Sequence, residues 1–146
     1  MVRRVVADAS VVIKWLVPQR PEEAGIPQAL ALLHEVDREG VCLHQPPHFV
    51  AEVMGVISRL YPDEAQSILA DLLNTAMRIE ESPAIYATTI QLSTQLKHHL
   101  FDTLYHATAL YVPGAVYVTA DGRYFEKAKN FGQIAFLAEL NLAQPN

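Results

Sequence analysis

Four acidic residues stand at positions from which their carboxylates could reach one site: Asp8, Glu52, Asp102 and Asp121. Two of them closely follow apolar, β-prone segments, and ligands of open α/β sheets bind at the carboxyl ends of the strands. Carboxylates that converge repel one another strongly, and the usual resolution is a hard divalent cation such as Mg²⁺ or Mn²⁺, which takes oxygen ligands. Such a site can activate a water molecule and clamp a phosphodiester.

Glu52 is the most informative of the four because it is the only charged residue in segment 49–58. A helix that is apolar all round is a buried helix, and a lone buried carboxylate needs a cation, a donor network or protonation. No lysine or arginine lies one helical turn from Glu52. The alternative is an exposed glutamate on a helix edge, or one paired with a distant arginine.

Each aspartate, taken alone, also has an ordinary structural explanation. Asp102 opens a helical segment, where an aspartate is a common N-cap. Asp121 could be an N-cap or form an Asx-turn with Gly122. The hypothesis of a shared site therefore depends on the pattern that the four acids make together.

The elements that must position these acids alternate between strand and helix along the chain. The predicted strands are segments 2–8, 41–43, 77–79, 115–119 and 134–137. The predicted helices are segments 10–16, 48–60, 62–77, 83–96, 102–112 and 121–130. A further helix is predicted to begin at Gln28 and to end at Gly40. This alternation predicts an α/β fold, a three-layer α/β/α domain with a central, mainly parallel sheet of four to five strands.

Composition narrows the class of protein. The 146 residues are 51% hydrophobic and 18% charged, which predicts one globular domain over residues 1–146. The net charge of −5 does not indicate nucleic-acid binding, although a local basic patch would be enough for such binding. A single cysteine, Cys42, excludes an internal disulfide and a cysteine zinc site, and it fits a reducing cytoplasm. Neither a signal peptide nor an 18-residue apolar span is evident, so no membrane contact is expected.

Other catalytic chemistries find little support. The His-Glu-x-x-His zinc pattern is missing, and surface or structural roles are expected for His44, His48, His98 and His99. His106 lies four residues after Asp102 and could support it from the same side of a helix. Ser10 lacks the Gly-x-Ser-x-Gly context of a nucleophile elbow.

Four short motifs occur in order along the chain, and each contains one of the acids. They are Val-Val-Ala-Asp-Ala-Ser at 5–10, Pro-x-x-Phe-x-x-Glu-Val at 46–53, Phe-Asp-Thr-Leu-Tyr-His-Ala-Thr-Ala at 101–109 and Val-Thr-Ala-Asp-Gly-Arg-Tyr-Phe at 118–125. Together they resemble the PIN-domain family, and more narrowly its VapC-like toxin branch. The resemblance extends from about Val5 to Leu137.

This resemblance implies a central parallel sheet, a carboxylate metal site for Mg²⁺ or Mn²⁺, and endoribonuclease activity. It assigns metal-binding and catalytic roles to all four acids, and Ser10 and Thr119 match small polar positions that support such sites. The implied partners are a VapB-like antitoxin and a second copy of the chain in a homodimer. Some relatives carry a further acidic or amide residue beyond the fourth acid, where Tyr124 and Phe125 stand here. The number of metal ions therefore stays open.

The leading hypothesis is metal-dependent hydrolysis of single-stranded RNA. Basic residues that flank the expected site could contact the RNA backbone, or could simply form a solvated surface: Lys14, Arg20, Arg123, Lys127 and Lys129. Aromatic residues could stack on bases but are more often core: Tyr105, Tyr111, Tyr124 and Phe125. One rival is a phosphatase of the haloacid-dehalogenase type, which needs a second aspartate where Ser10 stands. Another is a PIN fold that serves as a binding scaffold without turnover.

Overall fold

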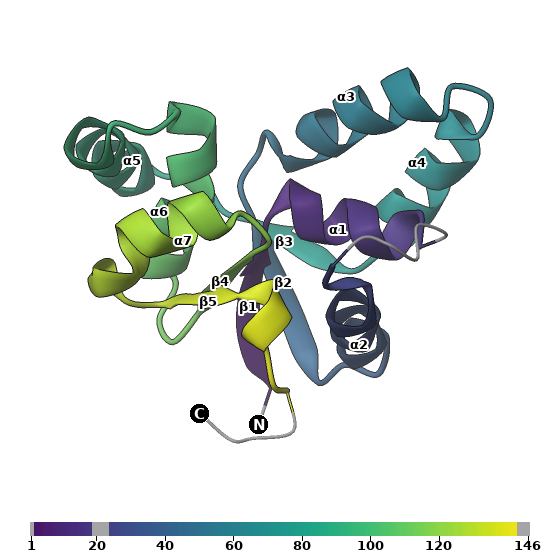
Figure 1. Ribbon diagram of the computed structural model, residues 1–146, viewed down its shortest axis with the longest axis horizontal. Coiled ribbons are helices and arrows are strands. Elements are labelled where there is room, and N and C mark those ends of the chain that lie inside the picture. Colours follow the sequence, from purple (N-terminus) through teal and green to yellow (C-terminus); the bar gives the residue numbers. More distant parts are fainter. Residues whose placement is uncertain (1, 19–23, 143–146) are drawn as a thin grey trace.

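A computed structural model of the chain describes residues 2–18 and 24–142 (Figure 1). Five strands form one sheet in the order β3-β2-β1-β4-β5, and every neighbouring pair is parallel. The strands are β1 (Arg3–Ala7), β2 (Val41–Gln45), β3 (Met77–Ile79), β4 (Val116–Thr119) and β5 (Ile134–Phe136). The predicted α/β fold with a parallel sheet is confirmed.

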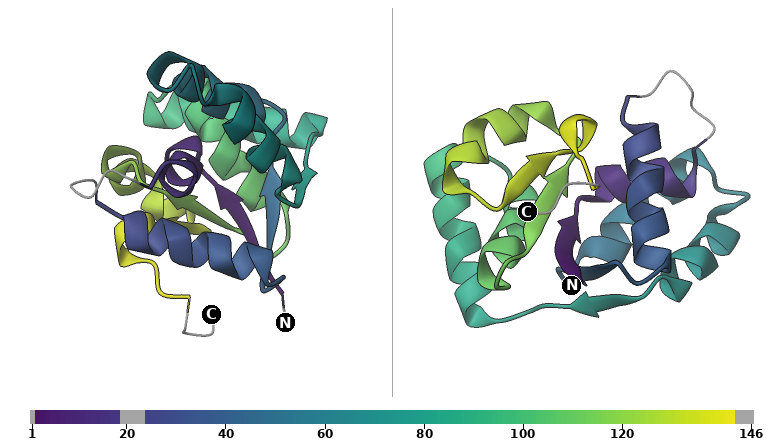
Figure 2. Two further views of the ribbon diagram at one scale, coloured as in Figure 1. Left: turned by 90° about the vertical axis from the view of Figure 1, so that its right-hand side faces the viewer. Right: turned by 90° about the horizontal axis from the view of Figure 1, so that it is seen from below.

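Helices cover both faces of the sheet. They are α1 (Ala9–Leu16), α2 (Ile26–Asp37), α3 (Phe49–Leu60), α4 (Ala65–Asn74), α5 (Pro83–Leu96), α6 (Leu100–Tyr111) and α7 (Gly122–Ala128), with the short 3₁₀ helices η1 (Lys129–Phe131) and η2 (Leu137–Glu139). Figure 1 shows α1 to α4 on one side of the central strands and α5 to α7 on the other. The views in Figure 2 place α1 between α2 and α3, and α1 contacts both.

The central strand, β1, is buried as its apolar sequence predicts. Val5, Val6 and Ala7 are at most 5% exposed, because β2 and β4 flank the strand and helices cover both of its faces. The chain leaves β1 toward β2 on one side and later returns to β4 on the other. The sheet order therefore reverses between β1 and β4, the place where open α/β sheets bind ligands.

A buried glutamine fixes the end of β1. The side chain of Gln45 is fully buried; its Oε1 accepts the N–H of Ala7 at 2.8 Å, and its Nε2 donates to the carbonyl of Ala7 at 2.8 Å. The N–H of Asp8 then donates to the carbonyl of Val118 in β4 at 3.0 Å. The backbone that carries Asp8 is thus held from both neighbouring strands.

Helix α3 differs from its prediction as a helix buried all round. Phe49, Val53 and Ile57 face the core and are fully buried, whereas Ala51 and Gly55 on the opposite side are exposed. Ala51 and Gly55 expose little apolar surface because both residues are small. Helix α4 also begins later than predicted, at Ala65. In the described part of the chain, no helix is long and apolar enough to cross a membrane.

Candidate metal and active site

The four predicted acids line one cleft of about 500 Å³: Asp8, Glu52, Asp102 and Asp121. The cleft lies at the carboxyl ends of β1 and β4, and its remaining walls come from α1, α3 and α6. Ser10 and Lys14 of α1 also line it. Residues from four separate motifs are thus brought together where the order of the strands reverses.

Asp8 is the most deeply placed acid, with 9% of its surface exposed. Its Oδ2 accepts hydrogen bonds from the hydroxyls of Thr119 at 2.9 Å and Ser10 at 3.1 Å. Burial raises the pKa of the Asp8 carboxyl, and these two hydrogen bonds only partly oppose that effect; the charge of Asp102 adds to it. Asp8 is therefore an acid whose ionised form is held in place but poorly compensated.

Thr119 connects Asp8 to Asp121. While its hydroxyl donates to Asp8, its oxygen accepts the N–H of Asp121 at 3.0 Å. Asp121 is the N-cap of α7, because its Oδ1 accepts the N–H of Tyr124 at 3.1 Å. The N-cap interpretation of Asp121 is confirmed, and the same side chain also lines the cleft.

Glu52 lies on the edge of α3, with 29% of its side chain exposed. The hydroxyl of Tyr105 donates to its Oε1 at 3.0 Å, and His48 Nε2 lies 3.6 Å from its Oε2. Partial burial raises the pKa of Glu52 to about 7; the Tyr105 hydrogen bond opposes the rise, and the charges of Asp8 and Asp102 increase it. The sequence left two alternatives, a buried Glu52 and an exposed Glu52. The structure shows an intermediate case, because the side chain is partly buried and hydrogen-bonded.

Asp102 lies in the first turn of α6, and the N-cap interpretation is wrong for it. Helix α6 begins at Leu100, and His99 Nδ1 accepts the N–H of Phe101, which makes His99 the N-cap. The Asp102 side chain is 42% exposed and its Oδ2 lies 3.0 Å from Nε2 of His98. This leaves Asp102 open to the cleft on one side and held on the other.

Comparison with known proteins decides the family. The PIN domain matches residues 5–130 of the chain. The chain belongs to the PIN-domain family. No curated protein matches it in sequence. Among solved structures, a chain from the crystal structure of VapBC2 from Rickettsia felis, bound to a DNA fragment from their promoter, superposes with a TM-score of 0.65. The two are 15% identical over 91% of this chain and 96% of that one, a likeness that establishes the fold.

The donor set of this PIN domain suits a hard divalent cation. As they stand, no three His, Cys, Asp or Glu side chains of the described residues are grouped closely enough to hold a metal ion. The cleft nevertheless offers four carboxylates, the ligands that Mg²⁺ and Mn²⁺ prefer. A cation there would reverse the effects that disfavour ionised Asp8 and Glu52, so the residues fit the group.

The predicted basic residues are placed unequally around the PIN domain's cleft. Lys14 lines it and is 7% exposed, and Arg123 at the start of α7 is exposed. Lys127 lies against His98, with its Nζ 3.3 Å from Nδ1 of the ring. Lys129 pairs with Glu126 at the surface. Arg20 falls outside the described residues.

Two histidines take roles that differ from those expected. His98 contacts Asp102, a role that sequence reasoning missed because His98 lies in the connection before α6 and Asp102 lies within that helix. His106 is fully buried, and its ring nitrogens lie 2.9 Å from the Tyr124 hydroxyl and 2.8 Å from the carbonyl of Gly132. His106 therefore braces Tyr124. Tyr105 and Tyr124 are buried as well, which removes both from base stacking.

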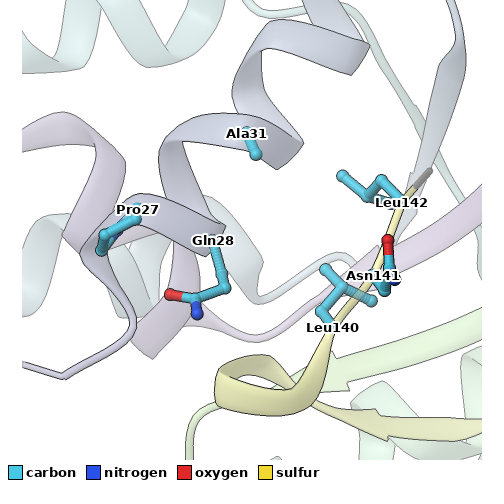
Figure 3. Close-up of a pocket in the computed structure, with 6 residues that line it drawn as sticks. All are labelled: Pro27, Gln28, Ala31, Leu140, Asn141 and Leu142. Atoms are coloured by element: carbon cyan, nitrogen blue, oxygen red, sulfur yellow. The ribbon is translucent and has the colours of Figure 1, made fainter.

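A second hollow, of about 330 Å³, lies between the start of α2 and the segment after η2 (Figure 3). It is lined by Pro27, Gln28, Ala31, Leu140, Asn141 and Leu142. These six residues include no ionisable side chain. This hollow therefore offers no carboxylate to a cation, in contrast to the acidic cleft.

Proposed function

We propose that this PIN domain is a metal-dependent endoribonuclease that hydrolyses phosphodiesters of single-stranded RNA. The observation that supports the proposal is the cleft itself, which gathers four carboxylates at the reversal point between β1 and β4. PIN domains are generally nucleases, and membership of the family supports hydrolysis of a phosphodiester bond. We assign metal-binding and catalytic roles to Asp8, Glu52, Asp102 and Asp121.

The residues that line the cleft take different roles in this proposal, according to where each one lies. When bound, Mg²⁺ or Mn²⁺ polarises the scissile phosphate and lowers the pKa of the attacking water. Asp8 is the fixed ligand, since Thr119 and Ser10 hold one of its oxygens. Glu52 must lose its proton to join it, and one acid, Asp8 or Asp102, orients the water. Lys14 and Arg123 supply positive charge toward the RNA backbone, which a protein of net charge −5 needs locally.

We further propose that the protein is a VapC-like toxin. In this proposal it acts on cytoplasmic RNA, forms a homodimer and is neutralised by a VapB-like antitoxin. The similarity to a chain of the VapBC2 complex supports this assignment through the fold. Co-expression with a candidate VapB-like antitoxin, followed by co-purification and size measurement, tests the partner and the dimer together.

The decisive experiment for the activity is cleavage of a mixed cellular RNA pool by purified protein with Mn²⁺ or Mg²⁺. Asp8→Asn and an EDTA-treated sample are run in parallel. Discrete fragments that vanish in both controls are expected. Metal binding without cleavage would instead favour a binding scaffold, and hydrolysis of a simple phosphate ester without RNA cleavage would favour a phosphatase. Either result would overturn the proposed endoribonuclease.

A further inference from the structure

His98 stands between a lysine and one of the four acids. Its Nδ1 lies 3.3 Å from the Lys127 ammonium on α7, and its Nε2 lies 3.0 Å from Asp102 Oδ2 on α6. The His98 side chain is only 12% exposed, while the Asp102 side chain is 42% exposed, so the histidine is the buried member of the His98–Asp102 contact. The three side chains form one continuous line from α7 to the cleft.

The chemistry of the three groups fixes the direction of their hydrogen bonds. An ammonium group can only donate, so the Lys127 contact requires a lone pair on Nδ1 of His98. The ring proton then resides on Nε2, which donates to the Asp102 carboxylate. Lys127 thus selects the one neutral tautomer of His98 that can hold Asp102.

The packing around the ring keeps this arrangement in place. The edge of Tyr124 meets the His98 ring with the centroids 4.8 Å apart, and Tyr124 is itself buried. The N–H of Tyr124 donates to Asp121, and its hydroxyl contacts His106. His98 is therefore braced by the same helix, α7, whose N-cap is Asp121.

We propose that Lys127 and His98 form a positioning pair that orients the Asp102 carboxylate for a divalent cation in the cleft. This inference rests on the proposed function, and it gives Lys127 a role other than direct contact with RNA. With Oδ2 held by His98, the second oxygen of Asp102 would be left to hold a cation. Hydrogen-bond partners that orient metal ligands contribute 10–100-fold to metal affinity or activity in other metalloproteins.

The two roles of Lys127 predict different results. If Lys127 contacts a phosphate, its removal raises KM for RNA. The same removal lowers the slope of RNA affinity against salt concentration, on logarithmic scales, by about one unit. A lysine that acts through His98 and Asp102 changes the affinity for the metal and leaves that slope as it was. Metal affinity measured without RNA therefore separates the two.

The experiment measures Mn²⁺ binding by calorimetry for the wild type and three variants. His98→Leu is expected to weaken binding by roughly 10–100-fold. His98→Gln keeps a donor toward Asp102 and an acceptor toward Lys127, and it is expected to stay within about threefold of the wild type. Lys127→Met is expected to weaken binding about threefold to tenfold, since the tautomer is no longer selected.

Control variants remove a histidine and a basic side chain far from the cleft. His34 and Arg38 lie at the end of α2, near the amino ends of the strands, and both are exposed. His34→Leu and Arg38→Met are expected to bind Mn²⁺ like the wild type. Thermal unfolding in EDTA checks that each variant is folded; if His98→Leu is not, Lys127→Met and the rescue by His98→Gln carry the test.

Two negative results have different meanings. A wild-type protein that binds no Mn²⁺ would overturn the proposed metal-dependent function, and this inference with it. A wild-type protein that binds Mn²⁺ and cleaves RNA, while a folded His98→Leu binds the metal equally well, would overturn only the positioning pair. A Lys127→Met protein with unchanged Mn²⁺ affinity and a lower salt slope for RNA would return Lys127 to direct phosphate contact and also overturn the pair.

Discussion

The two walls of the cleft hold their acids in different ways. On the strand wall, Asp8 is 9% exposed and receives two hydroxyl hydrogen bonds, while the buried Gln45 fixes the residue before it. On the helix wall, the side chains of Glu52 and Asp102 are 29% and 42% exposed. A side chain buried in a hydrogen-bond network has one position, whereas Glu52 and Asp102 are each held by one neighbour and reach solvent on their other side. The strand wall therefore sets the site, and the helix wall completes it from the solvent side.

The largest effect is expected at the fixed acid. Asp8→Asn keeps the shape of the side chain and one acceptor for Thr119 and Ser10, but it removes the charge that a cation needs. Cleavage of RNA with Mn²⁺ should fall by about 10³-fold. Because burial raises the pKa of Asp8, its ionised form opposes folding without metal, and the variant should unfold in EDTA at the same temperature or higher.

Asp37→Asn, at the exposed end of α2, is the matched control and should cleave like the wild type. Equal activity of Asp8→Asn and the wild type would contradict the idea that the strand wall sets the site.

The next effect concerns the support beneath the strand wall. Gln45→Leu fills the same space but leaves the N–H and carbonyl of Ala7 without the side-chain partner they have now. The free energy of unfolding should fall by about 2–3 kcal/mol, or roughly 10²-fold in the folding equilibrium. Gln28→Leu removes a surface hydrogen bond of 3.4 Å and should change stability by less than about 0.5 kcal/mol. Urea unfolding in EDTA measures both, and similar values for the two variants would contradict the role given to Gln45.

A smaller effect is expected on the helix wall, where protonation is coupled to metal binding. The pKa of Glu52 is raised from 4.5 to about 7, so a proton must leave before the carboxylate can bind a cation. Affinity for Mn²⁺ should rise as the pH approaches 7 and level off above it. Glu52→Gln should lose this step and bind about tenfold more weakly at pH 8.

The same shift has a stability consequence without metal. Between pH 4.5 and about 7 the folded state holds the Glu52 proton more tightly than the unfolded chain does. Stability therefore falls as the pH rises through this range, and Glu52→Gln should flatten the profile in proportion. Unfolding midpoints in EDTA across this range provide the measurement; an unchanged slope in the variant would show that Glu52 is not the titrating group.

The smallest effect separates the two hydroxyls that hold Asp8. Ser10 donates to Asp8 at 3.1 Å, whereas Thr119 donates to Asp8 at 2.9 Å and also accepts the N–H of Asp121. Ser10→Ala should weaken Mn²⁺ binding about threefold, and Thr119→Val about tenfold. The reverse order would mean that Ser10, and not the link to Asp121, holds the strand wall together.

Most of the fold and the meeting of the four acids in one cleft could be predicted because both depend on local signals. Apolar runs bounded by proline, glycine or aspartate mark the strands, and parallel strands bring their carboxyl ends to one edge. That is why Asp8 and Asp121 could be placed at one site before the structure was known.

The contacts that hold the acids could not be predicted because they depend on how elements pack. Residues 98–102 cross the connection between α5 and α6, where Lys97 takes a left-handed conformation with φ of 52°, so helical spacing could not be assumed for His98. Gln45 is the last residue of β2, and its side chain forms hydrogen bonds with the backbone of Ala7 in the neighbouring strand β1. The open side of α3 follows from its place at the rim of the sheet and not from its apolar sequence.

The position of β1 at the centre of the sheet also sets when the site can form during synthesis. One edge of β1 pairs with β2, which follows it closely, but the other edge pairs Val5 with Val116 in β4, near the end of the chain. Domains fold as they leave the ribosome from the N-terminal side. Until β4 has emerged, Asp8 lacks Thr119 and the cleft lacks Asp121. The acidic cleft therefore stays incomplete until β4 and Asp121 have been translated.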